Sequence, residues 1–274
     1  MWNFENSLSF EPIQFEIVSH FLMFGVGAHA AGLIYFLLSR NRVAPRYRMA
    51  TVASTVIMLT AGMMLARLAI NWQSAFTLDP AAMVYALDGT IFTNGFRYIN
   101  WLITIPLLLV QIVIVIGLQG ERFWRVYRTL VGAALGMIVT GYIGQFFERT
   151  STAQLLLWGT ISTAFYVWLL YVVWTEIGKA LPSLTPEAAQ WMKWIRIWFV
   201  VTWSLYPGGY LVPVVATTGD AVVARQIIYT VADVTSKVVY GLMISRVAQI
   251  LSAAEGWEPA QVIRERLLTA RRTA

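Results

Sequence analysis

Seven long apolar stretches are the feature of this 274-residue sequence that most constrains its fold. A helix that crosses the hydrocarbon core of a bilayer needs about 20 consecutive apolar residues. Seven segments meet that requirement, and they lie at residues 15–38, 49–72, 93–118, 124–147, 153–177, 192–215 and 221–251. Because the connections are short, the sequence predicts an all-α membrane protein, with residues 1–274 forming one domain and residues 15–251 forming an up-and-down seven-helix bundle.

The composition excludes several other classes of protein. Only 12% of the residues are charged and 58% are hydrophobic, whereas a soluble domain carries roughly 25% charged residues. The chain has no cysteine, which removes disulfides, thiolate catalysis and Cys-ligated metals, and its two histidines make a dedicated metal site unexpected. The formal net charge of +6 fits basic loops of a membrane protein and does not require nucleic-acid binding. We expect neither catalytic residues nor metal ligands, and no enzyme activity.

The basic residues predict the orientation of the bundle. Fifteen of the 20 Lys and Arg residues fall in alternate connections and at the C-terminal end. The Arg-rich side of a membrane protein faces the cytoplasm. We therefore expect the N-terminus outside the cell, the C-terminus inside, and residues 256–274 as a cytoplasmic tail.

Two charged residues lie in the middle of the seventh span. Asp233 and Lys237 are four residues apart, so both side chains lie on one helix face. Charged groups at this depth are costly and are functional hypotheses by default, although a self-neutralising ion pair is the structural alternative. A desolvated lysine favours its free amine, a nucleophile toward carbonyls. A Schiff base on Lys237 is a natural prediction, but the pair alone does not identify the aldehyde.

The third span carries a polar stripe. Arg97, Asn100, Thr104, Leu108 and Gln111 are three or four residues apart and lie on one helix face. Such a line through a membrane helix indicates a conduction path, and the alternative is hydrogen bonding between helices. An arginine in the stripe makes the second explanation insufficient.

Five motifs, in the same order and on the same helices, make the whole chain resemble the microbial (type 1) rhodopsins. They are Asp233-x-x-x-Lys237, Arg97-Tyr98-x-Asn100-Trp101-x-x-Thr104-x-Pro106, Met137 with Thr140-Gly141, Ile161-Ser162-Thr163-Ala164, and Trp203-x-x-Tyr206-Pro207-x-x-Tyr210.

The resemblance implies a light-absorbing cofactor, all-trans-retinal. It would be attached covalently to Lys237 as a protonated Schiff base, with Asp233 and Arg97 as the counterion group, and light would isomerise it. A polyene needs a long apolar slot with flat walls, which aromatic side chains supply. The residues that the resemblance assigns to this pocket are Trp101, Leu108, Met137, Gly141, Ser162, Thr163, Trp203, Tyr206, Pro207, Tyr210 and Ser236.

Three positions of the third span separate the subfamilies. Asn100, Thr104 and Gln111 resemble the Asn–Thr–Gln motif of bacterial light-driven chloride pumps. An amide takes up no proton near neutral pH, which disfavours outward proton pumping, and sodium pumps carry Asp at the middle position. The resemblance implies inward pumping of chloride, bound at Asn100, Thr104 and Trp101, along a path that includes Arg97 and Gln111. The outer half is expected to lack the glutamate pair that some archaeal members use for proton release.

Other functions remain open. They are a light-driven sodium or proton pump of the same fold, a photosensory rhodopsin that signals through a transducer, and a seven-helix protein without a chromophore, in which Lys237 pairs permanently with Asp233. The expected partners are the lipid bilayer, halide anions and further copies of the chain, as a trimer or pentamer. We expect the protein to be a multi-pass protein of the bacterial inner (cytoplasmic) membrane.

Three residues have two interpretations each. Gly159 either opens a side window for a carotenoid antenna or allows close helix packing. His29 fits packing or a subunit contact better than transport. Arg67, in the outer half of the second span, either snorkels to the membrane interface or lines an anion route.

Overall fold

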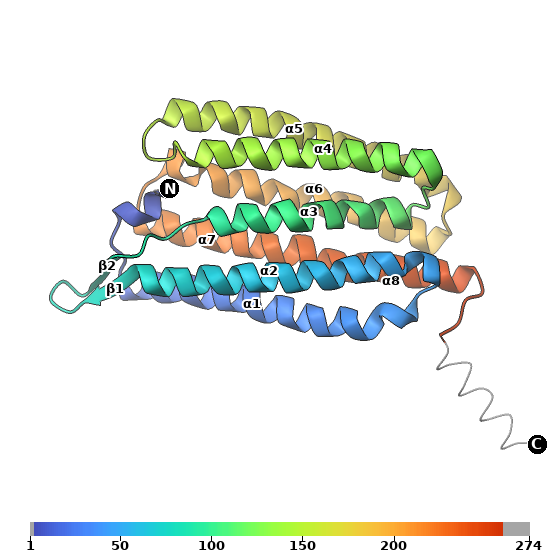
Figure 1. Ribbon diagram of the computed structural model, residues 1–274, viewed down its shortest axis with the longest axis horizontal. Helices are drawn as coiled ribbons and strands as arrows, with labels where there is room; N and C mark the ends of the chain where they lie inside the picture. Colours follow the sequence, from blue (N-terminus) through green and yellow to red (C-terminus); the bar gives the residue numbers. More distant parts are fainter. Residues whose placement is uncertain (1–2, 260–274) are drawn as a thin grey trace, which may run out of the picture.

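The computed structural model describes residues 3–259, so most of the tail predicted at 256–274 lies outside the described residues. Seven helical spans long and apolar enough to cross a membrane run side by side along the long axis (Figure 1). The α-helices are α1 (Pro12–Ser39), α2 (Arg48–Ala75), α3 (Gly95–Val115), α4 (Gly120–Gln145), α5 (Thr152–Ala180), α6 (Pro186–Val215), α7 (Gly219–Asp233) and α8 (Tyr240–Ala254). Together, α7 and α8 form the seventh span. The prediction of a seven-helix membrane bundle is confirmed.

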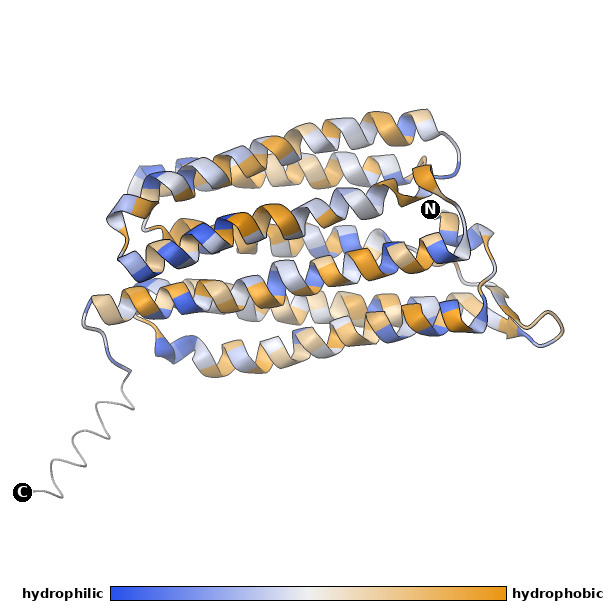
Figure 2. Ribbon diagram, turned by 180° about the vertical axis from the view of Figure 1, so that it is seen from behind, coloured by the Kyte–Doolittle hydropathy of each residue, from blue (hydrophilic) through white to orange (hydrophobic). Residues whose placement is uncertain are grey.

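The helix boundaries follow from local chemistry. The hydroxyls of Ser151, Thr185 and Thr218 accept backbone N–H groups in the first turns of α5, α6 and α7. Pro12 and Pro186 occupy first-turn positions, where no backbone N–H is needed. Hydrophobic residues run along the helices from end to end (Figure 2). Their apolar outer faces suit contact with lipid, since lipid tails are as apolar as the core.

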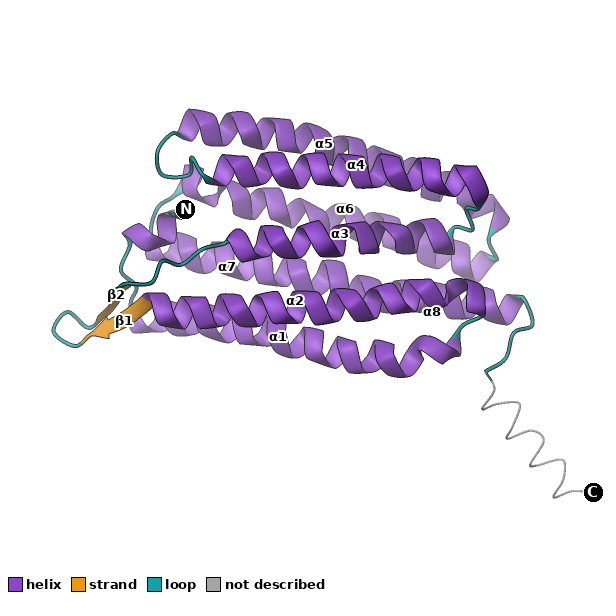
Figure 3. Ribbon diagram, in the orientation of Figure 1, coloured by secondary structure: helices purple, strands orange, loops and turns teal. Residues whose placement is uncertain are grey.

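Short elements close the two ends of the bundle (Figure 3). The helix η1 (Phe4–Ser7) and the antiparallel strands β1 (Phe76–Asp79) and β2 (Val84–Leu87) lie at one end, and α8 ends at the other. A backbone pairing of Phe10 with Tyr85 joins the N-terminal segment to the hairpin. The remaining short helices are η2 (Arg40–Arg42), η3 (Pro45–Tyr47) and η4 (Leu181–Ser183).

The seventh span changes its helical geometry around Lys237. A π-helical segment, η5 (Val234–Val239), separates α7 from α8. Such segments are rare and frequently mark functional sites. The indole N–H of Trp198 in α6 donates to the Thr235 carbonyl at 2.9 Å, so a neighbouring helix supports the altered backbone.

Gly241 generates the first prediction, because α8 packs there against two other helices. A Cβ at this position would lie 2.8 Å from the ring of Phe36 and 3.4 Å from the Ser54 hydroxyl. Overpacking of this kind costs about 1–3 kcal/mol, more than the helix propensity that Ala gains over Gly. Gly241→Ala should therefore lower the melting temperature in detergent, followed by circular dichroism.

The matched control is Gly132→Ala in α4, where a Cβ meets no atom within 4 Å. It should leave the melting temperature unchanged or raise it. Equal stability of the two variants would contradict the packing argument.

Candidate functional site

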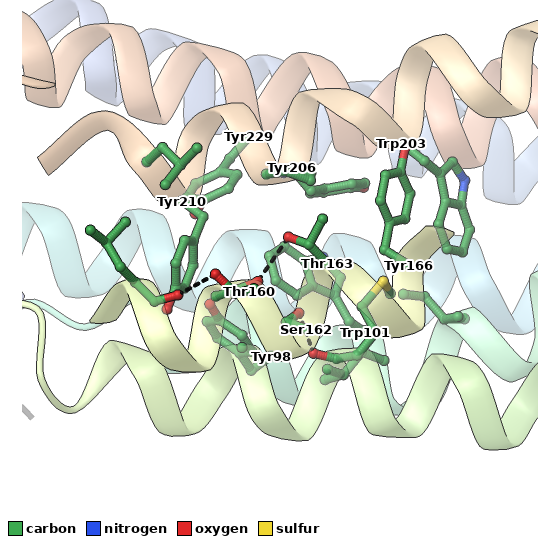
Figure 4. A pocket seen from close by; sticks show the side chains of 18 residues that line it. Tyr98, Trp101, Thr160, Ser162, Thr163, Tyr166, Trp203, Tyr206, Tyr210 and Tyr229 are labelled. Atoms are coloured by element: carbon green, nitrogen blue, oxygen red, sulfur yellow. Dashed lines mark hydrogen bonds between the residues drawn. The ribbon is translucent and has the colours of Figure 1, made fainter. Parts of the chain in front are cut away.

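A cavity of about 290 Å³ lies inside the bundle between α3, α4, α5, α6 and α7 (Figure 4). Aromatic side chains from four of these helices, α3, α5, α6 and α7, contribute to its wall. The lining residues are Tyr98, Trp101, Ile105, Met137, Ile138, Gly141, Leu156, Gly159, Thr160, Ser162, Thr163, Tyr166, Trp203, Tyr206, Pro207, Tyr210, Leu211 and Tyr229.

The cavity brings together most of the residues predicted for the pocket. Nine of them line it: Trp101, Met137, Gly141, Ser162, Thr163, Trp203, Tyr206, Pro207 and Tyr210. Leu108 and Ser236 are buried outside this lining. The Leu108 carbonyl accepts the Tyr240 hydroxyl at 3.0 Å, and the Ser236 hydroxyl lies 2.8 Å from that of Tyr206. Sequence reasoning missed Tyr166 and Tyr229, because no motif included them.

Tyr206 connects the cavity to the charged pair of the seventh span. Its hydroxyl donates to Asp233 Oδ1 at 3.0 Å and accepts a hydrogen bond from Lys237 Nζ at 3.1 Å. Lys237 also forms a direct ion pair with Asp233, and both side chains are buried. The Trp101 indole nitrogen lies 3.4 Å from the same carboxylate. The side-chain nitrogen of Lys237 is therefore held next to the aromatic cavity.

Arg97 completes this group of charges. Its Nη1 donates to Asp233 Oδ2 at 2.9 Å, and its Nη2 donates to Gln226 Oε1 at 2.9 Å. Arg97 is 2% exposed, and its Nε–H has no acceptor among the described residues. With Lys237 protonated, two buried cations face one buried carboxylate. The formal charge of the group is +1.

Asn100 and Thr104 lie on the same face of α3 and are completely buried. The Thr104 hydroxyl donates to the Asn100 carbonyl at 2.8 Å, a bond within the helix. Asn100 Oδ1 has no partner among the described residues. Because the oxygen and nitrogen of an amide are assigned from the hydrogen-bond network, the opposite rotamer presents N–H donors to the same place. Such N–H groups can donate hydrogen bonds to a buried anion.

Gln111 lies deeper along the predicted path and holds α3 to α2. Its Nε2 donates to the Ala50 carbonyl at 2.7 Å and to the Ser54 hydroxyl at 2.6 Å. It is completely buried, and its Oε1 has no partner among the described residues. At the end of the stripe farthest from Arg97, this side chain therefore ties α3 to α2.

The end of the bundle that carries η1 and the β1–β2 hairpin, which the sequence predicts to lie outside the cell and which we call the outer end, contains a carboxylate pair that the sequence did not predict. Glu5 of η1 and Glu148 of the α4–α5 connection both form ion pairs with Arg225 of α7. Arg225 and Glu5 are completely buried, and Glu148 is 8% exposed. No local pattern predicts this pair, because Glu5 lies outside every predicted span and Glu148 just beyond the fourth, and only folding brings them together. The sequence signal that pointed toward this cluster was Arg225, because it is a charged residue within the predicted seventh span.

Amide side chains connect this outer pair to the inner charges. Gln226 Nε2 donates to Glu5 Oε1 at 3.0 Å, while its Oε1 accepts the hydrogen bond from Arg97. Asn3 Nδ2 donates to Glu148 Oε2 at 2.8 Å. Burial raises the pKa of the Glu148 carboxyl, although Arg225 opposes that effect. One continuous polar network thus runs from the outer end of the bundle to Asp233.

The structure shows where Gly159, His29 and Arg67 lie, the three residues for which the sequence left two interpretations. Gly159 leaves room for the Tyr210 ring, since a Cβ there would lie 2.7 Å from it. His29 is completely buried in α1, with Nδ1 2.7 Å from the Gly25 carbonyl. Arg67 is exposed on α2, and its guanidinium lies 5.1 Å from the centre of the Phe96 ring.

Comparison with known proteins identifies the relatives of this chain. The family model described as "bacteriorhodopsin-like protein" matches residues 16–251. Green-light absorbing proteorhodopsin of gamma-proteobacterium EBAC31A08 is 24% identical over 194 residues, which are 66% of this chain and 76% of that protein. Bacteriorhodopsin of Halobacterium salinarum is 34% identical over 168 residues, which are 60% of each chain.

Solved structures agree with these sequence matches. The crystal structure of a thermophilic rhodopsin superposes with a TM-score of 0.85 at 31% identity, covering 91% of this chain and 99% of the other. Xanthorhodopsin, described as a light-driven ion pump with dual chromophore, superposes with a TM-score of 0.85 at 33% identity and the same coverage.

The outer ion pairs generate the second prediction. Arg225→Gln leaves two buried carboxylates without their cation, and breaking a buried pair in this way costs about 3–5 kcal/mol. Its melting temperature should fall strongly at neutral pH. The loss should shrink as the pH falls, because protonation of Glu148, whose pKa is raised by burial, removes the repulsion between the two carboxylates.

The control is Arg149→Gln, an exposed cation next to Glu148 in sequence. A surface change of this kind stays within about 0.5 kcal/mol. If thermal unfolding finds the two variants equally stable, the outer cluster does not stabilise the bundle.

Proposed function

The chain belongs to the bacteriorhodopsin-like protein family, and from that premise we propose that it is a retinal-binding, light-driven pump that moves chloride into the cell. Membership implies a multi-pass membrane protein with a retinal chromophore and light-driven ion transport. Family membership does not specify the transported ion, the direction of transport or the location in a bacterial inner membrane, and these three points are our proposal.

The residues of the cavity fit retinal. The cavity is close in volume to the smallest ligand pockets, about 300 Å³, and its walls are mainly apolar and aromatic. Trp101 and Trp203 supply flat surfaces, and Gly141 leaves space, since a Cβ there would lie 3.2 Å from the Ser162 hydroxyl. Retinal bound to Lys237 supplies a light-driven isomerisation. The protein's part is to hold the Lys237 nitrogen beside Asp233 and to exclude water from it.

The observation that carries the proposal of chloride is the charge of the buried site. Lys237 and Arg97 together exceed Asp233 by one positive charge. Two opposite unit charges 4 Å apart attract by about 4 kcal/mol at an effective dielectric of 20, so a buried anion would be stabilised here. A sodium ion would instead meet an excess of positive charge.

The side chains of the third span supply neutral donors where a proton pump needs carboxylates. Asn100, Thr104 and Gln111 neither accept nor release a proton near neutral pH. An anion near Asn100 and Thr104 can accept hydrogen bonds from the amide, from the Thr104 hydroxyl after it leaves the Asn100 carbonyl, and from the Lys237 N–H. Trp101 donates toward Asp233 and thereby helps to keep this carboxylate in place.

Transport then requires the anion to pass Arg97 on entry and Gln111 on exit. On the outer side, the anion enters past Arg97, whose free Nε–H can attract it. When the Lys237 N–H turns inward, the anion follows it past Thr104 toward Gln111. Exit requires Gln111 to release the Ala50 carbonyl and the Ser54 hydroxyl, because these bonds close the inner half.

One observation favours a second candidate, a proton or sodium pump of the same fold. The outer carboxylates Glu5 and Glu148 are groups that can release a proton or bind a cation. The two candidate functions differ in how illumination changes the pH of the medium around the cells. No observation on the described residues gives comparable support to a photosensory role. Adding retinal tests whether the protein binds a chromophore at all.

Two partners belong to the proposal. Leu156, Thr160 and Thr163 line the cavity and are exposed on α5, so the cavity reaches the lipid-facing surface near Gly159. An antenna carotenoid could lie against this opening, although Gly159 also leaves room for the Tyr210 ring. We keep assembly into a trimer or pentamer as a prediction.

Lys237 generates the third prediction. Lys237→Ala should not form a visible absorption band when retinal is added, because the aldehyde has no amine to bind. Lys193→Ala, which changes an exposed lysine of α6, should give the band of the unaltered protein. Absorption spectra with and without retinal measure both. A lasting visible band in Lys237→Ala would refute the attachment site.

The fourth prediction concerns the ion. Illuminated cells in a chloride medium should take up chloride and, passively, protons, so the medium becomes alkaline, and a protonophore should increase this change. Replacing chloride with sulfate should abolish the signal and shift the absorption band. A pH electrode and a spectrophotometer suffice. Acidification in the light, or an unchanged signal in sulfate, would replace chloride pumping with the second candidate.

A further inference from the structure

The outer cluster carries a charge that opposes an incoming anion. Glu5 and Glu148 surround the single cation Arg225, and all three are buried. The formal charge is −1 when both carboxyls are ionised. Buried ions are tolerated only when they are paired, so one carboxylate of this cluster lacks a full counter-charge.

The inner group carries the opposite charge. Arg97, Asp233 and protonated Lys237 sum to +1, so the outer and inner groups together are neutral before any anion binds. Only one side-chain amide, that of Gln226, separates Arg97 from Glu5. The two groups therefore influence each other through a short path of buried side chains.

An anion that binds at the inner group upsets this balance. It neutralises the inner +1 and leaves the outer −1 without compensation. A proton taken up by the outer carboxylates restores neutrality, because one glutamate can remain ionised beside Arg225 while the other carries the proton. We infer that the Glu5–Glu148 pair binds one proton when chloride binds near Asn100, so chloride and proton binding are thermodynamically linked.

The surroundings of the pair permit such a proton. The groups that hydrogen-bond the two carboxyls are Arg225 and Gln226 from α7, Asn3 from the N-terminal segment and Asn94 before α3. Gln145 from α4 accepts hydrogen bonds from Arg225 and Asn3. Tyr98, Tyr210 and Tyr229 lie farther away and interact with Glu148 through their charges only if ionised. Arg225 is the only cation among the groups that contact both carboxylates in the described part of the chain. Burial also raises the pKa of Glu148, which favours the protonated form.

The linkage has a definite sign and rests on the proposed function. Chloride binding raises the proton affinity of the pair, so by reciprocity a proton on the pair raises the chloride affinity. As the pH rises, the pair loses its proton and chloride binding weakens. Couplings between sites are typically 5–150-fold, and we expect the dissociation constant of chloride to rise about tenfold as this proton is lost.

The test measures proton uptake in the dark. Sodium chloride is added to the purified pigment in weakly buffered sodium sulfate of equal ionic strength, with a pH-indicating dye, while the visible band reports chloride binding. Infrared difference spectra in the same titration record the C=O band of a protonated carboxyl. We expect up to one proton per chloride and the appearance of this band.

Three variants make the test decisive. Glu148→Gln and Glu5→Gln should lose proton uptake and the carboxyl band, and their chloride affinity should no longer depend on pH. Glu16→Gln removes a half-exposed outer carboxylate beside His20 and should behave like the unaltered protein. The visible band verifies that each variant is folded around its chromophore.

The outcomes separate two failures. If chloride shifts the band without proton uptake, or if uptake persists in both Glu5→Gln and Glu148→Gln, the linkage is wrong and the chloride site stands. If chloride does not shift the band and sulfate supports the light-driven signal equally well, the chloride function is wrong and the linkage falls with it.

Discussion

The ion pair between Arg97 and Asp233 is the interaction on which the rest of the site depends. Asp233 also binds Lys237 and accepts the Tyr206 hydroxyl, so one carboxylate orients a cation from α3, a cation from the seventh span and a phenol from α6. Each of these charges is expensive inside a membrane, and each is tolerated because the others are present. The side-chain nitrogen of Lys237 can therefore lie beside the aromatic cavity without leaving an isolated buried charge.

The backbone around this carboxylate is adapted to the same task. The π-helical segment η5 carries Lys237, and Trp198 from α6 binds the Thr235 carbonyl inside it. Regular helices surround the segment on both sides, which restricts the altered geometry to the turn that presents the lysine. Local irregularity in a membrane helix is tolerated when neighbouring side chains satisfy the backbone, as Trp198 does here.

Polar groups are distributed unequally between the two halves of the bundle. The outer half holds a network of carboxylates, amides and guanidinium groups from Asn3 to Arg97, whereas the inner half is closed by the neutral amide of Gln111. The buried charges of the described residues lie between the η1 end of the bundle and Lys237. Gln111 and its two partners, by contrast, are neutral.

The sequence by itself determined the seven spans, their order, and the positions of Lys237, Asp233 and Arg97, because hydropathy over about 20 residues and charges inside a span are local properties of the chain. It also predicted nine of the residues that line the cavity, since helical spacing and the motifs of a known family put them on inward faces. Only the tertiary structure brought Glu5, Glu148 and Arg225 together, from segments separated by 77 to 220 residues. It also decided the π-helical turn at Lys237 and the partners of Gln111. Contacts between distant segments depend on how the helices pack, and no local pattern of residues encodes that packing.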